Sequence, residues 1–230
     1  MDERLEQRAP NGRLLSFRRM TPPTSSSRVG RRRRQQILDV ATELFAKSGF
    51  HGVTVDDLGA AVGVSGPALY HHFASKEELL GEMLVSISEY LLDGGRRRVA
   101  AAAGPSDALD ELLRGHIDFA LDRTSLITVH VRELVHAPEL QRKRVRALQN
   151  EYAELWVDVL LQLDPLLDRR IGRAGAHAVF GLLNSTPHSR RASREVMAGL
   201  LFEMGHAALD TLDQMGGRED TNRSALHAID

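Results

Sequence analysis

Apolar residues recur at intervals of three and four along most of this chain, and this periodicity limits the fold more than any other feature of the sequence. One such stripe begins at Ile37 and the final one ends at Leu212, whereas few runs alternate with period two. Gly63, Gly94-Gly95 and Gly104-Pro105 interrupt the pattern, as residues that end helices do. We therefore predict an all-α protein of about nine helices.

The helices predicted from this pattern fall into two groups. Three short helices and a longer one occupy residues 31–93. Five more follow at about 106–122, 125–136, 139–163, 168–187 and 192–214. Both ends of the chain are polar, so we expect a disordered basic tail at 1–30 and a flexible tail at 216–230.

Charge is distributed unevenly along the chain. The net charge is −1, but residues 1–34 hold ten arginines against three acidic residues, which favours a polyanionic partner at this end. The chain has no cysteine, which excludes disulfides and thiolate zinc sites and fits the reducing cytoplasm, where we expect the protein to be located. No segment approaches the roughly 18 apolar residues of a membrane span, so we expect no membrane partner.

Two short helices joined by Gly63-Val64-Ser65 have the size and turn chemistry of a helix-turn-helix. In the second of them, Leu69 and Phe73 are four residues apart and are predicted to face the core. The opposite face is then free to meet the major groove of DNA. It carries Gly66, Pro67, Tyr70 and His71.

The complete string of residues 54–73, followed by Ser75-Lys76-Glu77-Glu78-Leu79, resembles the DNA-binding domain of the TetR (tetracycline-repressor-type) family of transcriptional regulators. The resemblance is specific over residues 31–80. It implies a homodimer that binds double-stranded operator DNA, with C-terminal helices that enclose a small-molecule pocket and form the dimer interface. The function it implies is a ligand-responsive regulator, a repressor that its effector releases from the operator.

With this resemblance, the four segments of the chain acquire expected roles. Residues 31–93 are predicted to form a three-helix helix-turn-helix DNA-binding domain, and residues 94–215 a helical ligand-binding and dimerisation domain. The tails at 1–30 and 216–230 flank them. We expect neither enzymatic activity nor a cofactor.

The residues predicted to contact DNA lie in the recognition helix and near the ends of its neighbours. Tyr70 is expected to donate its hydroxyl to a phosphate, its alternative being a place in the core, and Lys76 in a first helical turn is expected to meet an anion. The recognition helix lacks Arg, Lys, Asn and Gln, so base readout would depend on Pro67, Ala68 and His71 or on DNA shape. The full set is Arg31, Arg32, Arg33, Arg34, Thr54, Ser65, Gly66, Pro67, Ala68, Tyr70, His71 and Lys76.

The helices after residue 139 are too apolar for a single solvated face, which favours burial both inward and against a second subunit. The candidate pocket walls are Phe119, Val129, Trp156, Phe180 and Leu183, and the candidate polar anchors are Arg132, Tyr152, Asn184 and His188. For each of them, an ordinary place in the core or on the surface is the alternative. The lining indicates an amphipathic effector, and the resemblance makes a fatty acyl or acyl-CoA thioester a candidate, with arginines meeting its phosphates.

Two other functions compete with this interpretation. Glu133-Leu134-Val135-His136 and Glu203-Met204-Gly205-His206 both read E-x-x-H, and a di-iron carboxylate bundle uses two such motifs with two further Glu. However, Pro138 places the first motif at a helix end, which disfavours such an oxidoreductase. A ligand-free architectural DNA binder would lack an enclosed cavity. No P-loop, G-x-S-x-G or H-E-x-x-H string favours hydrolase or NTPase chemistry.

Overall fold

The computed structural model describes residues 25–189 and 191–227, with side chains described for residues 30, 32–189 and 191–212. Within this part every regular element is helical, as predicted. The elements are α1 (Ser25–Ser48), α2 (Val55–Val62), α3 (Gly66–Leu69), α4 (Lys76–Ala101), α5 (Pro105–Asp122), α6 (Thr124–Glu133), the 3-10 helix η1 (Leu134–His136), α7 (Glu139–Leu163), α8 (Arg169–Leu183), α9 (Thr186–Ser189) and α10 (Arg194–His227).

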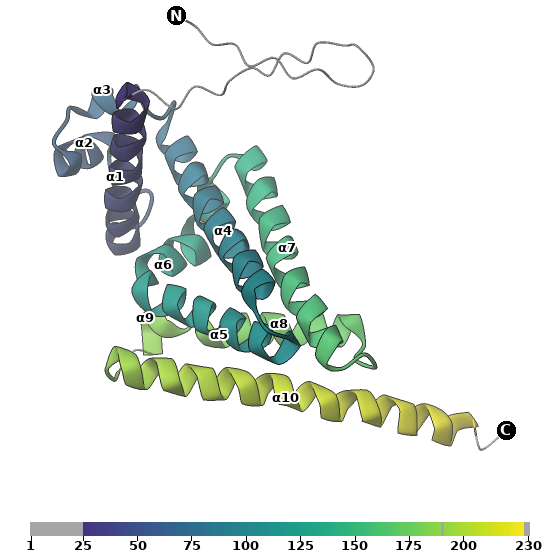
Figure 1. The fold of residues 1–230 in the computed structure, drawn as a ribbon. Helices are drawn as coiled ribbons and strands as arrows, with labels where there is room; N and C mark the ends of the chain where they lie inside the picture. The colour runs from purple at the N-terminus through teal and green to yellow at the C-terminus, as the bar shows by residue number, and fades with distance from the viewer. Residues whose placement is uncertain (1–24, 190, 228–230) are drawn as a thin grey trace, which may run out of the picture. The chain divides into compact units, whose positions relative to one another are not determined.

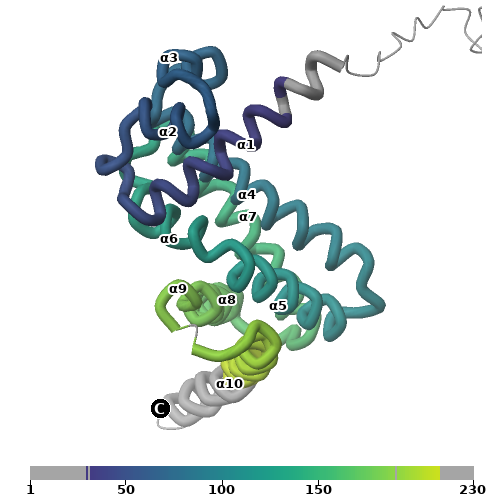
Figure 2. The backbone as a smooth tube through the Cα atoms, turned by 90° about the vertical axis from the view of Figure 1, so that its left-hand side faces the viewer, coloured from purple at the N-terminus to yellow at the C-terminus, as the bar shows by residue number. Residues whose placement is uncertain are grey.

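The chain divides into two compact units, residues 1–35 and 36–230. The described part of the first unit is the beginning of α1. All packing described below lies within the second unit. There α4 packs on α5 and α7, and α8 packs on α7 and α10, an arrangement that can be followed in Figures 1 and 2.

Local signals in the sequence explain how α2 and α3 form. The backbone N–H and the side-chain hydroxyl of Thr54 donate to Asp57 Oδ2 at 2.8 and 2.6 Å, and the N–H of Asp57 donates back to the hydroxyl at 3.1 Å. This complete capping box begins α2, and its hydrogen bonds lower the pKa of the Asp57 carboxyl. Gly63 ends α2 in the left-handed region with φ 74°. The chain can therefore turn sharply into α3.

The second unit has two main hydrophobic cores. One joins α2, α3 and the start of α4 to residues 36–50 and includes Phe45, Leu58 and Phe73. It also contains Val129 of α6 and Val145 of α7. The body helices therefore share a core with the helix-turn-helix. The other core fills the body around the fully buried Trp156.

The largest differences from the predicted helix boundaries lie in α1, α4 and α10. Helix α1 begins at Ser25 rather than near residue 31, so the predicted tail at 1–30 overlaps it, and residues 1–24 lie outside the described part. Helix α4 continues through Gly94-Gly95, because Gly95 allows close packing: a Cβ there would lie 2.9 Å from Tyr152 Cε2. Helix α10 extends to His227 instead of ending near residue 214, since no proline interrupts it. The domain limits at 93/94 and 215/216 stay predictions.

Candidate functional site

The segment from Ser65 to Phe73 has one buried side and one exposed side. Leu69 and Phe73 are each 3% exposed and belong to the core that surrounds the helix-turn-helix. Pro67 and His71 are exposed, and Tyr70 is 53% exposed. The expectation that Leu69 and Phe73 anchor the segment is confirmed, and three of the four residues expected opposite them face solvent.

Helix α3 itself is only four residues long, but the helical path continues after it. The N–H groups of Tyr70, His71 and His72 donate to carbonyls three residues back, and the N–H of Phe73 donates to Leu69 at 3.0 Å. Ser65 occupies the N-cap position, yet its hydroxyl makes no capping hydrogen bond. That hydroxyl is exposed.

Gly66 is not on the exposed face where the sequence analysis placed it. It is buried against α2, and a Cβ there would lie 2.1 Å from Asp56 Oδ1. Gly59 of α2 makes the matching close approach, because its Cβ would lie 2.7 Å from the Gly66 nitrogen. Two glycines therefore let the helices of the motif touch. Spacing along one helix could not reveal this contact.

Lys76 at the start of α4 has partners within the chain. Its Nζ donates to the carbonyl oxygens of Phe50 and Val53 at 2.9 and 2.8 Å. It also lies 4.2 Å from the centroid of the Phe50 ring. These contacts stabilise the Lys76 cation in a first helical turn. An external anion is therefore not needed to explain a cation at this position. DNA contact by Lys76 stays a prediction.

The arginine run lies inside α1 rather than before it. Arg32 is exposed, whereas Arg33 and Arg34 are half-buried. The side chain of Arg31 lies outside the described part. Thr54 is exposed beside the helix-turn-helix, and Ala68 is half-buried. The DNA-binding roles of these residues stay predictions.

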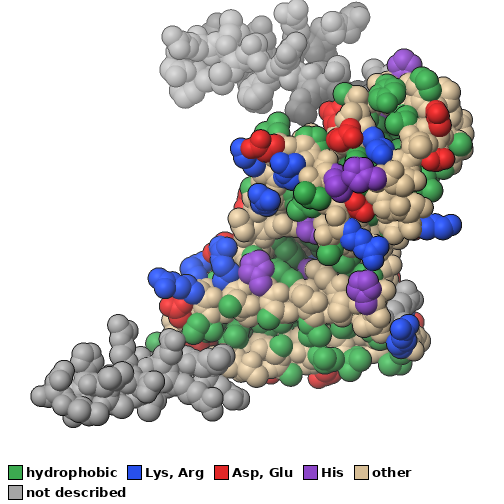
Figure 3. Space-filling view, turned by 180° about the vertical axis from the view of Figure 1, so that it is seen from behind, with side chains coloured by type: hydrophobic (Ala, Val, Ile, Leu, Met, Phe, Trp, Pro, Cys, Tyr) green, Lys and Arg blue, Asp and Glu red, His purple; other side chains and the backbone are tan. Residues whose placement is uncertain are grey.

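A cavity of about 240 Å³ lies in the body of the chain. Helices α4, α5, α6, α7 and α8 and the residue after α8 provide its walls. The lining residues are Ile87, Ser88, Leu91, His116, Phe119, Leu126, Ile127, His130, Val131, Gln149, Tyr152, His177, Phe180 and Asn184. A hollow with hydrophobic side chains inside it and histidines nearby is visible in Figure 3.

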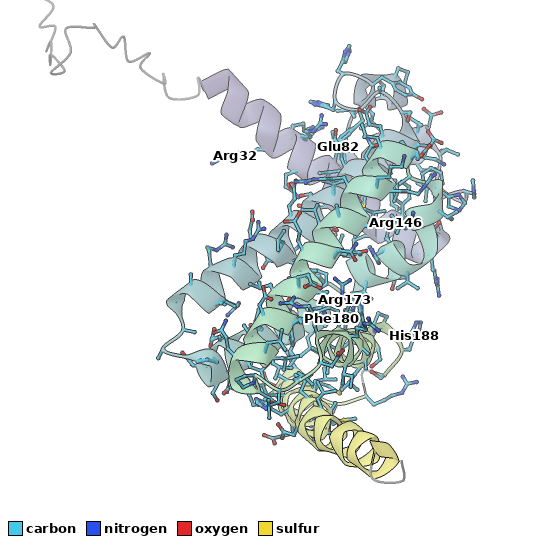
Figure 4. All side chains as sticks on the ribbon, turned by 90° about the vertical axis from the view of Figure 1, so that its right-hand side faces the viewer. Arg32, Glu82, Arg146, Arg173, Phe180 and His188 are labelled. Carbon is cyan, nitrogen blue, oxygen red and sulfur yellow. The ribbon has the colours of Figure 1, made fainter. Side chains whose placement is uncertain are left out.

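Four of the nine predicted ligand-binding residues line this cavity: Phe119, Tyr152, Phe180 and Asn184. Of the others, Trp156 and Leu183 are fully buried in the body core, and Val129 is buried in the core around the helix-turn-helix. Arg132 and His188 are exposed and do not line the cavity. Figure 4 labels Phe180, which lies in the helical body, and His188, which lies near its edge.

The main residue that the sequence analysis missed is His116. It lies on the buried face of α5, in the apolar stripe of Leu109, Leu112 and Leu113. Its ring nitrogens Nδ1 and Nε2 lie 3.2 Å from the Tyr152 hydroxyl and 3.2 Å from Asn184 Oδ1. A histidine inside an apolar helical stripe is the signal that could have identified it.

Burial determines the charge of the group formed by His116, Tyr152 and Asn184. It lowers the pKa of the His116 imidazole to about 4, although the Asn184 hydrogen bond opposes the shift. Burial likewise raises the pKa of the Tyr152 hydroxyl well above its usual range and lowers the pKa of His130, another cavity residue. These three groups of the cavity wall are therefore polar but uncharged near pH 7.

A second hollow, of about 420 Å³, lies between α4 and α5 and is more polar. Arg97 and Arg98 line it, and Arg98 pairs with Glu111 at 2.9 Å. Leu91 and Tyr152 line both hollows, so the two are neighbours. Together they offer an apolar compartment beside a polar one, whose lining includes Asp107 and Glu111 as well as the two arginines.

The two E-x-x-H motifs engage different neighbours. His136 lies 3.7 Å from Glu133 and packs its ring on Phe50, whereas His206 contacts Asp110 at 2.7 Å. Across the part of the chain with described side chains, no three His, Asp or Glu side chains gather as metal ligands. The geometry gives the di-iron interpretation no support.

Among the described residues, no helix combines the length and apolarity required to cross a lipid bilayer.

Comparisons with known proteins agree with the helix-turn-helix geometry. Residues 37–83 match the family model described as bacterial regulatory proteins, tetR family, and residues 102–188 match the tetracyclin repressor-like C-terminal domain. The HTH-type transcriptional repressor KstR2 of Rhodococcus jostii (strain RHA1) is 33% identical over 144 residues, which span 61% of this chain and 70% of that repressor.

Solved structures share the fold. A TetR-family transcriptional regulator from Bordetella parapertussis 12822 aligns with a TM-score of 0.68 and 26% identity, covering 75% of this chain and 93% of that one. AibR, in a complex with isovaleryl coenzyme A and operator DNA, aligns with a TM-score of 0.61 and 22% identity, over 75% of this chain and 97% of AibR. With family models on both halves of the chain and this close a repressor relative, the chain belongs to the TetR family of bacterial regulatory proteins.

Proposed function

We propose that this chain is a homodimeric, ligand-responsive repressor that binds operator DNA through the segment from Ser65 to Phe73. One observation carries the proposal: Pro67, Tyr70 and His71 are exposed on a segment whose other side is fixed in a core by Leu69 and Phe73. A rigid support with an exposed edge is what a major-groove reader needs. The function involves no catalysis or cofactor, and we place it in the cytoplasm with its DNA.

Dimerisation is supported by an apolar stripe that stays exposed on α10. Val196, Leu200 and Met204 recur every fourth residue and are 60%, 50% and 44% exposed. The opposite side of the same helix is already buried in the body core through residues such as Leu201 and Leu209. A second copy would cover the exposed stripe and place two recognition segments on successive major grooves, roughly 34–36 Å apart.

The two neighbouring hollows support an amphipathic effector. The apolar cavity suits a fatty acyl chain, and Arg97 beside the Arg98–Glu111 pair suits an anionic head group such as the phosphates of an acyl-CoA. Since AibR is solved with isovaleryl coenzyme A and operator DNA, one fold can serve both ligands. The presence of this cavity disfavours a purely architectural DNA binder.

Helices α4 and α6 connect the cavity to the helix-turn-helix. Ile87, Ser88 and Leu91 of α4 line the cavity, and the same helix begins at Lys76 beside the recognition segment. Helix α6 contributes Ile127 to the cavity, while Val129 of α6 is buried in the core around the helix-turn-helix. An effector that prefers a shifted arrangement of these helices would lower DNA affinity by its preference for that state.

Titration of the protein with its own upstream DNA, in a mobility-shift assay at several salt concentrations, tests this function. We expect an affinity that falls steeply with salt, because phosphate contacts release counterions. Tyr70→Phe should weaken binding to operator and random DNA alike, by roughly three- to tenfold, since it removes one hydroxyl donor. Tyr90→Phe is the matched control, because Tyr90 is 61% exposed but lies on the α4–α5 hollow. No salt-sensitive binding, or equal effects of the two variants, would contradict the proposal.

A further inference from the structure

The apolar cavity contains one organised polar group in its wall. Tyr152, His116 and Asn184 all line it, and the histidine ring lies between the other two side chains at 3.2 Å from each. None of the described residues that line the cavity is Asp, Glu, Lys or Arg. A molecule in this cavity therefore meets a local, uncharged hydrogen-bonding site.

The directions of these hydrogen bonds determine which atoms remain for a ligand. The amide oxygen of Asn184 can only accept, so His116 Nε2 carries the proton and donates to it. The Tyr152 hydroxyl then donates to the unprotonated Nδ1. Both ring nitrogens are thereby occupied. The two N–H groups of the Asn184 amide have no partner among the described residues, and they are the donors left to the cavity.

The other polar residues of the cavity wall have partners or lie at its rim. The Ser88 hydroxyl donates to the Leu84 carbonyl at 2.8 Å. His130 and Gln149 contact each other through their side-chain nitrogens at 2.5 Å. His177 is exposed, unlike His116. Asn184 therefore offers both of its amide N–H groups to the cavity, whereas Gln149 offers one, because the other contacts His130.

We propose that Asn184, positioned by His116 and Tyr152, binds a carbonyl oxygen carried on the apolar body of the effector. A saturated hydrocarbon body would cover the amide N–H groups without replacing their hydrogen bonds to water, which is unfavourable. A ketone oxygen at the same place accepts from them. Because the buried His116 is neutral near pH 7, with its pKa lowered to about 4, the site favours an uncharged oxygen over a carboxylate. This inference rests on the proposed function and refines the effector to an oxygenated apolar compound.

The chain carries its own reporter for the test. Trp156 is the single tryptophan of the sequence and is fully buried. Its ring meets the cavity residues Phe180 and Tyr152 edge-on, with centroids 5.1 and 6.1 Å away. Its fluorescence can therefore follow the filling of the cavity by 1-decalone and by decalin, two bicyclic probes that differ in one ketone oxygen.

The measured quantity is a ratio, the affinity for 1-decalone divided by the affinity for decalin. This ratio is compared between the wild-type protein and each variant, so that the different solubilities of the two probes cancel. We expect Asn184→Leu to lower this ratio by roughly tenfold or more, because the donor is lost. Asn184→Ala, which adds no bulk, should lower it similarly. Ser185→Ala, next to Asn184 but outside the cavity lining, should leave it within about twofold, since the Ser185 hydroxyl contacts the Ser189 hydroxyl.

Two results would overturn the inference: an unchanged ratio in both Asn184 variants, or no Trp156 response to either probe in the wild-type protein. Mobility shift of the upstream DNA is measured separately and shows that each variant is folded. If the wild-type protein bound 1-decalone with the expected selectivity but no DNA, the proposed function would fail while the Asn184 site would stand.

Discussion

The His136 ring lies nearly parallel to the Phe50 ring, with 5.4 Å between their centroids and 10° between their planes. His51 meets the same histidine edge-on at 4.3 Å. Helix η1, which ends at His136, directly follows α6, a wall of the ligand cavity. Phe50 lies in the loop before α2. This stack therefore joins the helices that surround the cavity to the helix-turn-helix.

Replacement of His136 by alanine should remove these ring contacts. We expect His136→Ala to lower the free energy of unfolding by about 1 kcal/mol, the typical contribution of an aromatic pair. Urea denaturation followed by circular dichroism would measure the change. His188→Ala, at an exposed position outside the cavity, should leave the midpoint unchanged. A comparable loss in both variants would show that the stack contributes nothing particular.

We expect Lys76 to contribute to the stability of the fold, whether or not it also contacts DNA. Lys76→Ala leaves the carbonyls of Phe50 and Val53 without their donor, so we expect a loss of about 1–2 kcal/mol in the free energy of unfolding. Lys76→Arg should restore part of it. The salt dependence of DNA binding separates the two roles. A phosphate contact would reduce the slope of log affinity against log salt by about 0.9 in Lys76→Ala, whereas a purely structural role leaves the slope unchanged.

The exposed stripe of α10 should control the oligomeric state. Leu200→Glu places a charge at the centre of the proposed interface, so we expect monomers in analytical ultracentrifugation and at least tenfold weaker operator binding. Leu166→Glu is the matched control, because Leu166 is 89% exposed in the loop between α7 and α8. If the Leu200→Glu protein remained a dimer, the interface would have to lie elsewhere on the molecule.

Acid should destabilise the fold through His116. Its folded-state pKa of about 4 lies below the ordinary value of 6.5, so the unfolded chain binds more protons between these values. The stability gained from the neutral ring is complete above pH 6.5 and is lost as the pH falls towards 4. Between pH 7 and pH 5 we expect this residue to contribute a loss of about 2 kcal/mol in the free energy of unfolding. Urea denaturation at both values should show the loss in the wild-type protein, and a much smaller one in His116→Asn.

The helix-turn-helix was predictable because its determinants are local. The Thr54–Asp57 capping box and the left-handed Gly63 can each be recognised within a few residues of sequence. The same is true of the spacing that buries Leu69 and Phe73. The intramolecular partners of Lys76 could not be predicted, for the opposite reason. Its carbonyl partners lie 23 and 26 residues away, and only the tertiary fold brings them to its side chain.

The cavity was only partly predictable, because its walls come from five different helices. Helical stripes correctly selected aromatic residues such as Phe119 and Phe180, but they also selected Leu183 and Val129, which face solid core. Periodicity identifies the inward face of a helix but does not show whether that face meets a neighbour or a hollow. The crossing of α4, α5 and α7 decides this, and it depends on contacts distant in sequence.

Gly95, which lines the hollow between α4 and α5, shows how closely α4 approaches α7. At this position α4 presents bare backbone to Tyr152 and Leu155 of α7, and even a methyl group would lie 2.9 and 3.0 Å from their side-chain carbons. Such a group would push the two helices apart, beside the hollow where we propose that part of the effector binds. We therefore expect substitutions of this glycine to abolish the response to the effector, or to hold the protein in the state that does not bind DNA. They would do so although Gly95 lies far along α4 from the recognition segment.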